Sequence, residues 1–215
     1  MFDAAWFLTL FLHVLPMAAT PEALHPHYPY ALTARGAAGD LTVTYMTVDY
    51  NPERLEGLEK GFEWHLAFAA LETAFPIQSG DVQVPAGKYK LDVVLGAEED
   101  GEWSVLLTPY DLWRARMTAQ RARDDERRAS AEKQVADIEA ALKENGAPLR
   151  AVLPTTGRDG VRADHLTIEM VHRGYRTTRN GSIEADGGLS VALRIDMGDE
   201  HRVVELAEVR PEKKD

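Results

Sequence analysis

The 215-residue chain contains no cysteine, and this absence removes several kinds of chemistry at once. Disulfide frameworks, thiolate zinc sites, thiol nucleophiles and lipid attachment through an N-terminal cysteine are all excluded. Basic residues are scarce too, with 24 Lys and Arg against 35 Asp and Glu, which gives a formal net charge of −11. Because binding to nucleic-acid phosphates needs a basic surface, this balance argues against a nucleic-acid partner.

Recognisable catalytic motifs are missing as well. The sequence has no G-x-S-x-G elbow, no phosphate-binding G-x-x-x-x-G-K-[ST] loop and no dinucleotide-binding fingerprint. No cofactor is therefore predicted, and a non-enzymatic protein is favoured over an enzyme. Paired carboxylates remain open, since a catalytic pair is defined by its separation in space.

One long apolar run is present, at residues 4–19, and the polar sequence Thr20-Pro21-Glu22 follows it. This pattern predicts a signal peptide over residues 1–19 and an exported protein, periplasmic or secreted. The absence of Lys or Arg before the run and the large Met17 near the expected cleavage site depart from the pattern, and a buried N-terminal helix is the alternative. At about 16 residues the run is shorter than a membrane-spanning helix requires, so no stable span is expected after signal removal.

Loop-forming residues dominate residues 20–40, where Pro, His, Ala and Gly predict an N-terminal arm. Residues 41–209 are expected to form a single domain, and 210–215 a charged tail. Apolar residues alternate with polar ones at 41–50, 165–171, 189–197 and 202–209, which is the mark of strands with one buried face. Residues 65–75 are ambiguous between helix and strand.

The clearest local signal is a hairpin over residues 82–107. The sequence Pro85-Ala86-Gly87 predicts a turn, because proline fixes φ and glycine accepts positive φ. Beyond it, Tyr89, Leu91 and Val93 share one face of a strand, and residues 96–101 are expected to close the hairpin with an acidic loop. Two strands alone are marginally stable, so the hairpin must belong to a larger sheet.

Residues 108–146 interrupt the β pattern with a helical insertion, either one long helix or a broken one. Thr108 and Pro109 predict its start, and Gly146 predicts its end. Its thin apolar seam contains Ala131 and the candidate partner-binding residues Val135, Ile138 and Leu142. This seam could pack on the protein's own sheet, which is the default expectation, pair with another subunit, or offer a ridge to a partner.

These patterns together predict a mainly β fold: an antiparallel β-sandwich-like domain of seven or eight strands with one long or broken α-helical insertion. The block over residues 64–107 resembles the mostly exported bacterial family called domain of unknown function 2911. Three features carry the resemblance: Trp64, the turn Val84-Pro85-Ala86-Gly87-Lys88-Tyr89, and Glu102-Trp103-Ser104-Val105. The resemblance implies a sandwich-like fold and export, but no reaction.

The chain departs from that family in two places. The helical insertion is one of them. The other is residues 65–68, which replace a polar stretch whose arginine and asparagine are therefore not carried over. We expect any function to lie where the chain departs.

Candidate site residues are few. Trp64, Tyr89 and Trp103 could line an aromatic pocket for a small ligand, although core packing explains them equally. His25 and His27 could bind a metal, but no spacing identifies a third ligand. The leading hypothesis is an exported, non-enzymatic module that binds a protein or a cell-envelope component. The alternative is a small-ligand carrier or hydrolase with a pocket lined by those aromatic residues.

Overall fold

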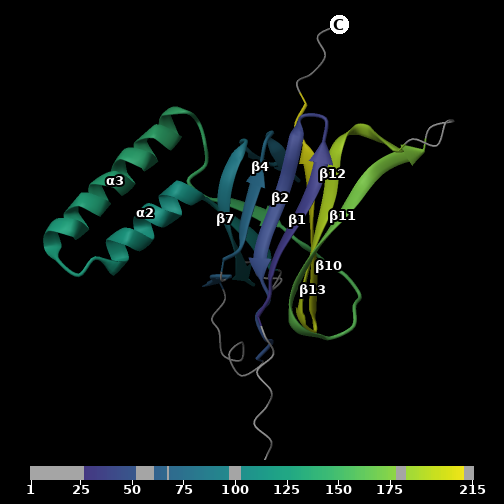
Figure 1. The fold of residues 1–215 in the computed structure, drawn as a ribbon, viewed down its shortest axis with the longest axis horizontal. Coiled ribbons are helices and arrows are strands. Elements are labelled where there is room, and N and C mark those ends of the chain that lie inside the picture. The colour runs from purple at the N-terminus through teal and green to yellow at the C-terminus, as the bar shows by residue number, and fades with distance from the viewer. Residues whose placement is uncertain (1–26, 52–60, 67, 97–102, 178–182, 211–215) are drawn as a thin grey trace, which may run out of the picture.

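The structure is a computed structural model, and it describes residues 27–51, 61–66, 68–96, 103–177 and 183–210. Two antiparallel sheets face each other, and a pair of helices projects from one side (Figure 1). The predicted fold class, a mainly β sandwich-like domain with a helical insertion, is confirmed. The predicted signal peptide, residues 97–101 of the predicted acidic loop and residues 211–215 of the charged tail lie outside the described residues.

The first sheet holds seven strands, with β3 pairing on β7 beside the main order. In that order the strands are β1 (Pro29–Gly36), β2 (Gly39–Met46), β4 (Ala70–Thr73), β7 (Gly87–Leu95), β8 (Ser104–Pro109) and β9 (Ala151–Pro154), with β3 at Phe62–Trp64. The ambiguous stretch 65–75 therefore contains a strand, and no helix forms in its described residues.

The second sheet holds six strands, with β10 pairing on β13. They are β11 (Ala163–Thr177), β12 (Ile183–Gly198), β13 (Glu200–Glu208), β5 (Ile77–Ser79) and β6 (Val82–Val84), with β10 at Thr156–Gly157. The described residues thus form more strands than the seven or eight expected, because several are only two to four residues long and carry little alternation.

The core lies between the sheets and is built from the alternating residues of their inner faces. On β7, Tyr89, Leu91 and Val93 are all buried, as the alternation predicts. The strict alternation of β12 likewise places Leu189, Val191 and every second residue to Met197 in the core. Periodicity was sufficient to orient these strands, because the apolar residues of each alternate along its core-facing side.

The predicted N-terminal arm is wrong over residues 29–36, which form β1 and pair with β2 along eight consecutive positions. Proline and glycine in the segment hid the alternation of Tyr30, Leu32 and Ala34. The tight β1–β2 turn depends on Gly39, whose φ is +128°. A side chain there would meet the Cβ of Ala74 at 2.5 Å, so only glycine fits.

The hairpin predicted over residues 82–107 is confirmed for β7 and β8, which pair from Tyr89 and Pro109 to Val94 and Ser104. The strand before the turn belongs elsewhere, since β6 pairs with β5 in the second sheet. The turn at residues 85–87 therefore carries the chain from one sheet to the other.

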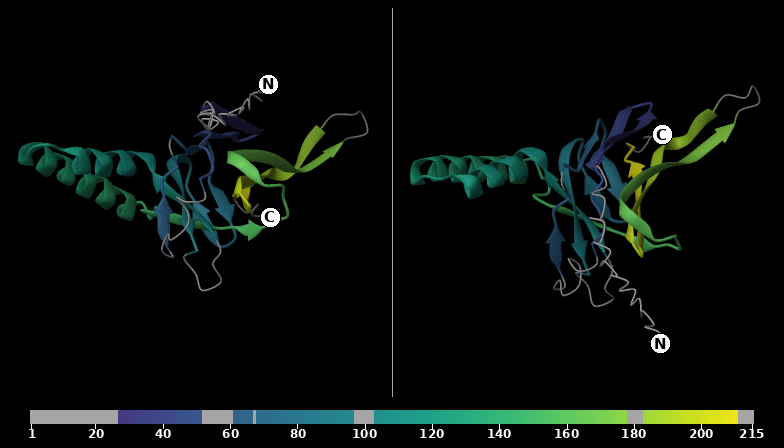
Figure 2. Two further views of the ribbon diagram at one scale, coloured as in Figure 1. Left: turned by 90° about the horizontal axis from the view of Figure 1, so that it is seen from below. Right: turned by 60° about the horizontal axis from the view of Figure 1, so that its bottom comes forward.

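The insertion is broken into two helices, α2 (Tyr110–Arg121) and α3 (Asp125–Glu144), which form a helical hairpin. The predicted cap at Thr108 is wrong, because Thr108 continues β8 and pairs with Lys90. Asp124 caps α3 by accepting a hydrogen bond of 2.8 Å from the Arg127 amide. Gly146, at φ +66°, ends α3 as predicted. The helical hairpin extends away from the sandwich in every view (Figure 2).

Candidate functional site

The seam of α3 faces its neighbouring helix and not the sheet. Val135, Ile138 and Leu142 are half-buried, and α2 is the element against which α3 packs. The default expectation that this seam packs on the protein's own sheet is therefore wrong. The reason is the three-residue connection at 122–124, which turns α3 back along α2 before it can reach a strand.

The helical hairpin is attached through α2, whose first turns cover the outer face of β7 and β8. Leu112 and Ala115 of α2 are buried, as are Val94 and Leu106 on the outer face of those strands. All four lie outside the main core cluster. The hairpin thus rests on a small second core at its base, and the rest of it lies clear of the sandwich (Figure 2).

A buried ion pair lies beside this second core. The Lys90 Nζ and the Asp92 Oδ1 are 2.6 Å apart, with side chains 5% and 3% exposed. The ammonium also donates to the carbonyl oxygens of Leu66 and Leu91, at 2.6 and 2.8 Å. The Asp92 carboxylate accepts from the Leu66 amide at 3.0 Å and contacts His65 Nδ1 at 3.2 Å. Burial lowers the pKa of Lys90, and the hydrogen bond and charge of Asp92 oppose that shift.

The position of this pair follows from the strand pairing. Strands β3 and β4 both pair with β7, and the chain between them leaves the ladder. Lys90 and Asp92 satisfy the peptide groups of Leu66 that the ladder does not. In the same connection Phe68 has φ +57° and a side chain that is 76% exposed.

Trp113 of α2 joins the ion pair to the helical hairpin. The Lys90 Nζ lies 5.9 Å from the centre of the Trp113 ring, which in turn lies 5.3 Å from the ring of Tyr110. Lys88 Nζ lies over the Tyr110 ring at 4.9 Å. The residues after Trp64 and the insertion, where a function was expected, therefore meet at the base of α2.

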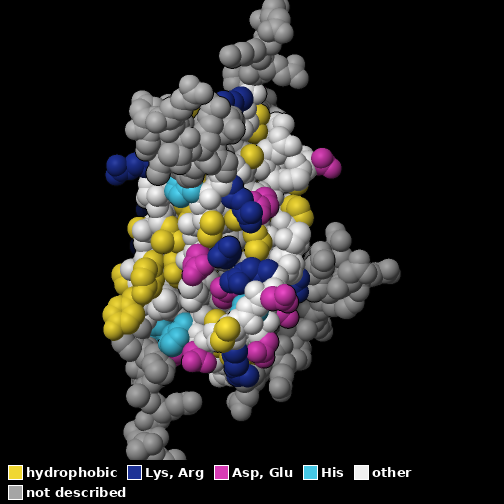
Figure 3. All heavy atoms as spheres, turned by 90° about the vertical axis from the view of Figure 1, so that its right-hand side faces the viewer, with side chains coloured by type: hydrophobic (Ala, Val, Ile, Leu, Met, Phe, Trp, Pro, Cys, Tyr) yellow, Lys and Arg dark blue, Asp and Glu magenta, His cyan; other side chains and the backbone are white. Residues whose placement is uncertain are grey.

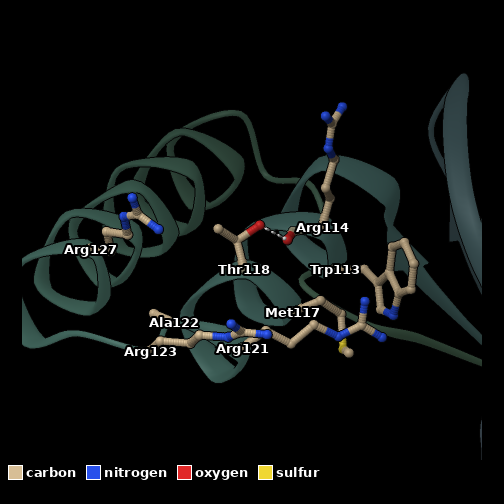
Figure 4. Close-up of a pocket in the computed structure, with 8 residues that line it drawn as sticks. All are labelled: Trp113, Arg114, Met117, Thr118, Arg121, Ala122, Arg123 and Arg127. Atoms are coloured by element: carbon tan, nitrogen blue, oxygen red, sulfur yellow. Dashed lines mark hydrogen bonds between the residues drawn. The ribbon is translucent and has the colours of Figure 1, made fainter.

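An open groove of about 480 Å³ runs from Trp113 toward the connection between the two helices. Figure 4 shows the Arg121 side chain extended along α2 toward Met117 and Trp113. The groove is lined by Trp113, Arg114, Met117, Thr118, Arg121, Ala122, Arg123 and Arg127. It therefore combines the apolar side chains of Trp113 and Met117 with four arginine residues, in a chain whose net charge is strongly negative.

Three of these guanidinium groups lack a carboxylate partner. Arg127 Nε is 3.3 Å from Asp124, but Arg114, Arg121 and Arg123 form no ion pair with any described residue. The groove was not predicted from the sequence. No sequence signal could reveal it, since it needs the turn between the helices and the position of Trp113.

The three aromatic residues proposed for a ligand pocket are spread along β7. Trp64 pairs with Val93, and Trp103 precedes Ser104, the partner of Val94. Tyr89 lies four residues before Val93, about 13 Å away along the strand. The Tyr89 hydroxyl donates to the Pro85 carbonyl at 2.8 Å. The aromatic residues therefore do not share one level of the sandwich, and their ligand-binding role stays a prediction.

The predicted metal pair is described in part. His25 lies outside the described residues, and His27 Nδ1 is 2.7 Å from the Thr47 carbonyl oxygen. That nitrogen acts as a donor and only Nε2 remains for a metal. Among the described residues no three His, Asp or Glu side chains are grouped as a metal site requires.

A second polar cluster ties a loop to the turn between β12 and β13. His201 Nδ1 is 2.9 Å from Asp196 Oδ1, and Arg158 pairs with the other oxygen of the same carboxylate. Gly160 packs on the His201 ring so closely that a Cβ would lie 2.5 Å from it. These contacts fix the loop against the strand ends, which accounts for the cluster structurally.

Comparison with known proteins returns no relative. The chain matches no protein-family model, no curated protein and no solved structure. The resemblance to domain of unknown function 2911 therefore stays a prediction. Within the described part of the chain, neither helix has the length and apolarity needed to cross a bilayer.

Proposed function

We propose that this chain is an exported, non-enzymatic binding module whose helical hairpin binds an acidic segment of a protein partner. The observation that carries the proposal is the groove, which is lined by Trp113, Met117 and three arginines that form no ion pair with a described residue. Arginine pairs with carboxylates in a bidentate manner, and its stem and plane pack well on apolar and aromatic groups.

The way the helical hairpin is attached to the sandwich supports this role. None of the main core cluster comes from the two helices, so the helical hairpin adds little to the sandwich beyond its base. Its seam is used internally, and its outer surface is polar. Such an appendage is explained by a contact with another molecule better than by folding.

The groove favours an extended acidic peptide over an anionic membrane. A narrow chain can place its carboxylates on Arg114, Arg121 and Arg123 while an apolar side chain contacts Trp113.

The test uses the purified protein and a fluorescein-labelled glutamate-rich peptide with leucine at two positions. We expect saturable binding by fluorescence anisotropy, weakened by added salt. The double variant R121Q/R123Q should weaken binding by roughly tenfold or more. R173Q/R194Q is the matched control, because it removes the same charge from arginines of the sandwich, which pair with Glu205 and Glu169 away from the groove.

Equal binding of a lysine-rich peptide, or equal loss in both double variants, would contradict the proposal. So would tighter binding to phosphatidylglycerol vesicles than to the peptide, since that result indicates a membrane surface. Export rests on the predicted signal peptide, and recovery of the protein from the cell envelope with Met1 retained would count against it.

A further inference from the structure

The edges of the two sheets differ in how they are protected. Six strands in the described part of the chain pair with a single other strand: β1, β3, β6, β9, β10 and β11, the last of which also bridges to Asp49 at His165. Unpaired strand edges are templates for another chain, and proteins protect them by keeping them short, bulged or charged. Four of the six edges contain only two to four residues.

The edge of β11 is long but carries the other two protections. Its register with β12 is interrupted between Ala163 and Thr167 and again between Arg173 and Tyr175. It also carries charged residues, among them Asp164 and Glu169. An approaching strand would meet an irregular, charged edge there.

The edge of β1 has none of these protections over most of its length. Its eight residues pair with β2 in unbroken register, and Tyr28 extends the ladder through its carbonyl, which accepts from the Thr47 amide at 3.1 Å. Residues 27–36 contain no Asp or Glu, and their one proline, Pro29, begins the strand. Apart from β2, no described residue gives β1 a backbone hydrogen bond.

The same strand exposes an aromatic stripe. Tyr28 and Tyr30 are 54% and 46% exposed, whereas Leu32 is half-buried and Ala34 fully buried, so the stripe emerges from the sandwich toward the start of β1. The Tyr30 ring stacks on Tyr45, with centroids 5.3 Å apart. Figure 3 shows hydrophobic side chains gathered along one side of the face that carries β11, and β1 lies beside β11 in Figure 1.

We infer that β1 is a self-association edge, on which the β1 strand of a second copy pairs antiparallel about a two-fold axis. The first sheet of one copy and the first sheet of the other then form one continuous sheet across the interface. When two identical strands pair antiparallel about a two-fold axis, the even-numbered residues of both strands point to the same face of the joined sheet. The stripe of Tyr28, Tyr30 and Leu32 therefore meets the same stripe of the partner.

The charge along the edge of β1 is compatible with a second copy as the occupant. Two chains of net charge −11 repel over most of their surfaces, and an approach is least opposed where neither side carries a carboxylate. The edge of β1 meets that condition on both partners at once, since the same acid-free strand supplies both sides. This inference concerns the sandwich and is independent of the proposed groove.

The experiment is sedimentation velocity of the full chain across a concentration series. We expect a reversible dimer whose dissociation constant rises roughly tenfold or more in Tyr30→Glu, because a buried charge replaces an aromatic contact. Val152→Glu is the matched control: Val152 is 49% exposed on the edge strand β9, and its replacement should leave dimerisation unchanged.

A second measurement does not depend on how Tyr30→Glu folds. Because the chain lacks cysteine, single-cysteine variants report one contact each. Ala31→Cys should form an intermolecular disulfide under mild oxidation, and Val152→Cys should not. A chain that stays monomeric at all concentrations, a dimer unaffected by Tyr30→Glu, or equal cross-linking at both cysteines would overturn the inference.

Discussion

At the scale of single residues, the buried Lys90–Asp92 pair is the most demanding feature of the fold. Every donor of the ammonium has an acceptor. The Leu66 amide donates to Asp92, and the Leu66 carbonyl accepts from Lys90 as well as from the Ala69 amide. A buried ion pair adds little net stability over apolar residues, but removing one partner leaves an uncompensated charge. Its role here is to hold the β3–β4 connection against β7 beneath α2.

Asp92→Asn tests this role directly. The asparagine can still accept from the Leu66 amide, but the Lys90 ammonium loses its counter-charge, so we expect a loss of about 3–5 kcal/mol in the free energy of unfolding. The double variant Lys90→Met/Asp92→Asn should recover much of that loss, since no charge remains buried. Urea denaturation followed by circular dichroism measures both.

The control for this series is Lys88→Met on the same strand. Lys88 pairs with Glu72 at 3.8 Å with both side chains largely exposed, and its loss should cost at most about 1 kcal/mol. If Asp92→Asn lowered the free energy of unfolding no more than Lys88→Met, the buried pair would not hold the β3–β4 connection as we describe.

The contribution of Tyr89 to the stability of the fold depends on pH. Burial raises the pKa of Tyr89, so its phenol stays protonated in the fold after the unfolded-state phenol, with a pKa of about 10, has begun to ionise. The contribution of Tyr89 to stability is therefore complete below about pH 10 and is lost as the pH rises through its raised pKa.

Tyr89→Phe removes that pH dependence. At neutral pH we expect it to cost about 0.5–1.5 kcal/mol, through the hydrogen bond to Pro85 that it loses. The advantage of the wild type should shrink above pH 10 in unfolding experiments at neutral and alkaline pH. The pKa of Tyr45 is also raised and that of Lys90 is lowered, but both residues are present in both proteins, so their contributions to the difference cancel. A constant difference across this range would contradict the assignment.

At the scale of elements, sequence patterns predicted those strands whose alternation is long and uninterrupted. The strands β7, β8, β12 and β13 were found because apolar residues alternate along the core-facing side of each, and both ends of the helical insertion carry local signals. The strand β1 was missed because proline and glycine occupy its ends, and the turn at residues 85–87 gave no sign that it changes sheets.

The candidate site was beyond sequence reasoning because its parts are distant in the chain. Leu66 and Asp92 are 26 residues apart and meet only through the pairing of β3 and β4 with β7. Likewise, the charge of residues 121–128 was visible, but not that α3 folds back on α2 instead of a sheet. Whether an amphipathic helix packs on another helix or on a sheet depends on tertiary geometry, whereas periodicity describes only the helix itself.

At the scale of the whole molecule, the sandwich and the helical hairpin have separate cores. The main core cluster contains no residue of α2 or α3, and the strands that flank the insertion, β8 and β9, already pair antiparallel from Ser104 and Pro154 to Leu107 and Ala151. A short turn could therefore join them. The groove and the β1 edge lie on different parts of this arrangement, so each can be removed without the other.

Replacing residues 110–147 by a short Gly-Asn linker tests this division. We expect the sandwich to keep its β-sheet circular dichroism but to lose about 2–5 kcal/mol of stability, because Leu106 and the Lys90–Asp92 pair lose the cover of Leu112 and Trp113. Binding of the glutamate-rich peptide should vanish, since the three unpaired arginines of the groove are gone. Self-association through β1 should keep its dissociation constant, because that edge gains and loses no contact. Loss of dimerisation in a still-folded deletion variant would place the interface on the helices, and loss of all β structure would show that the sandwich depends on them.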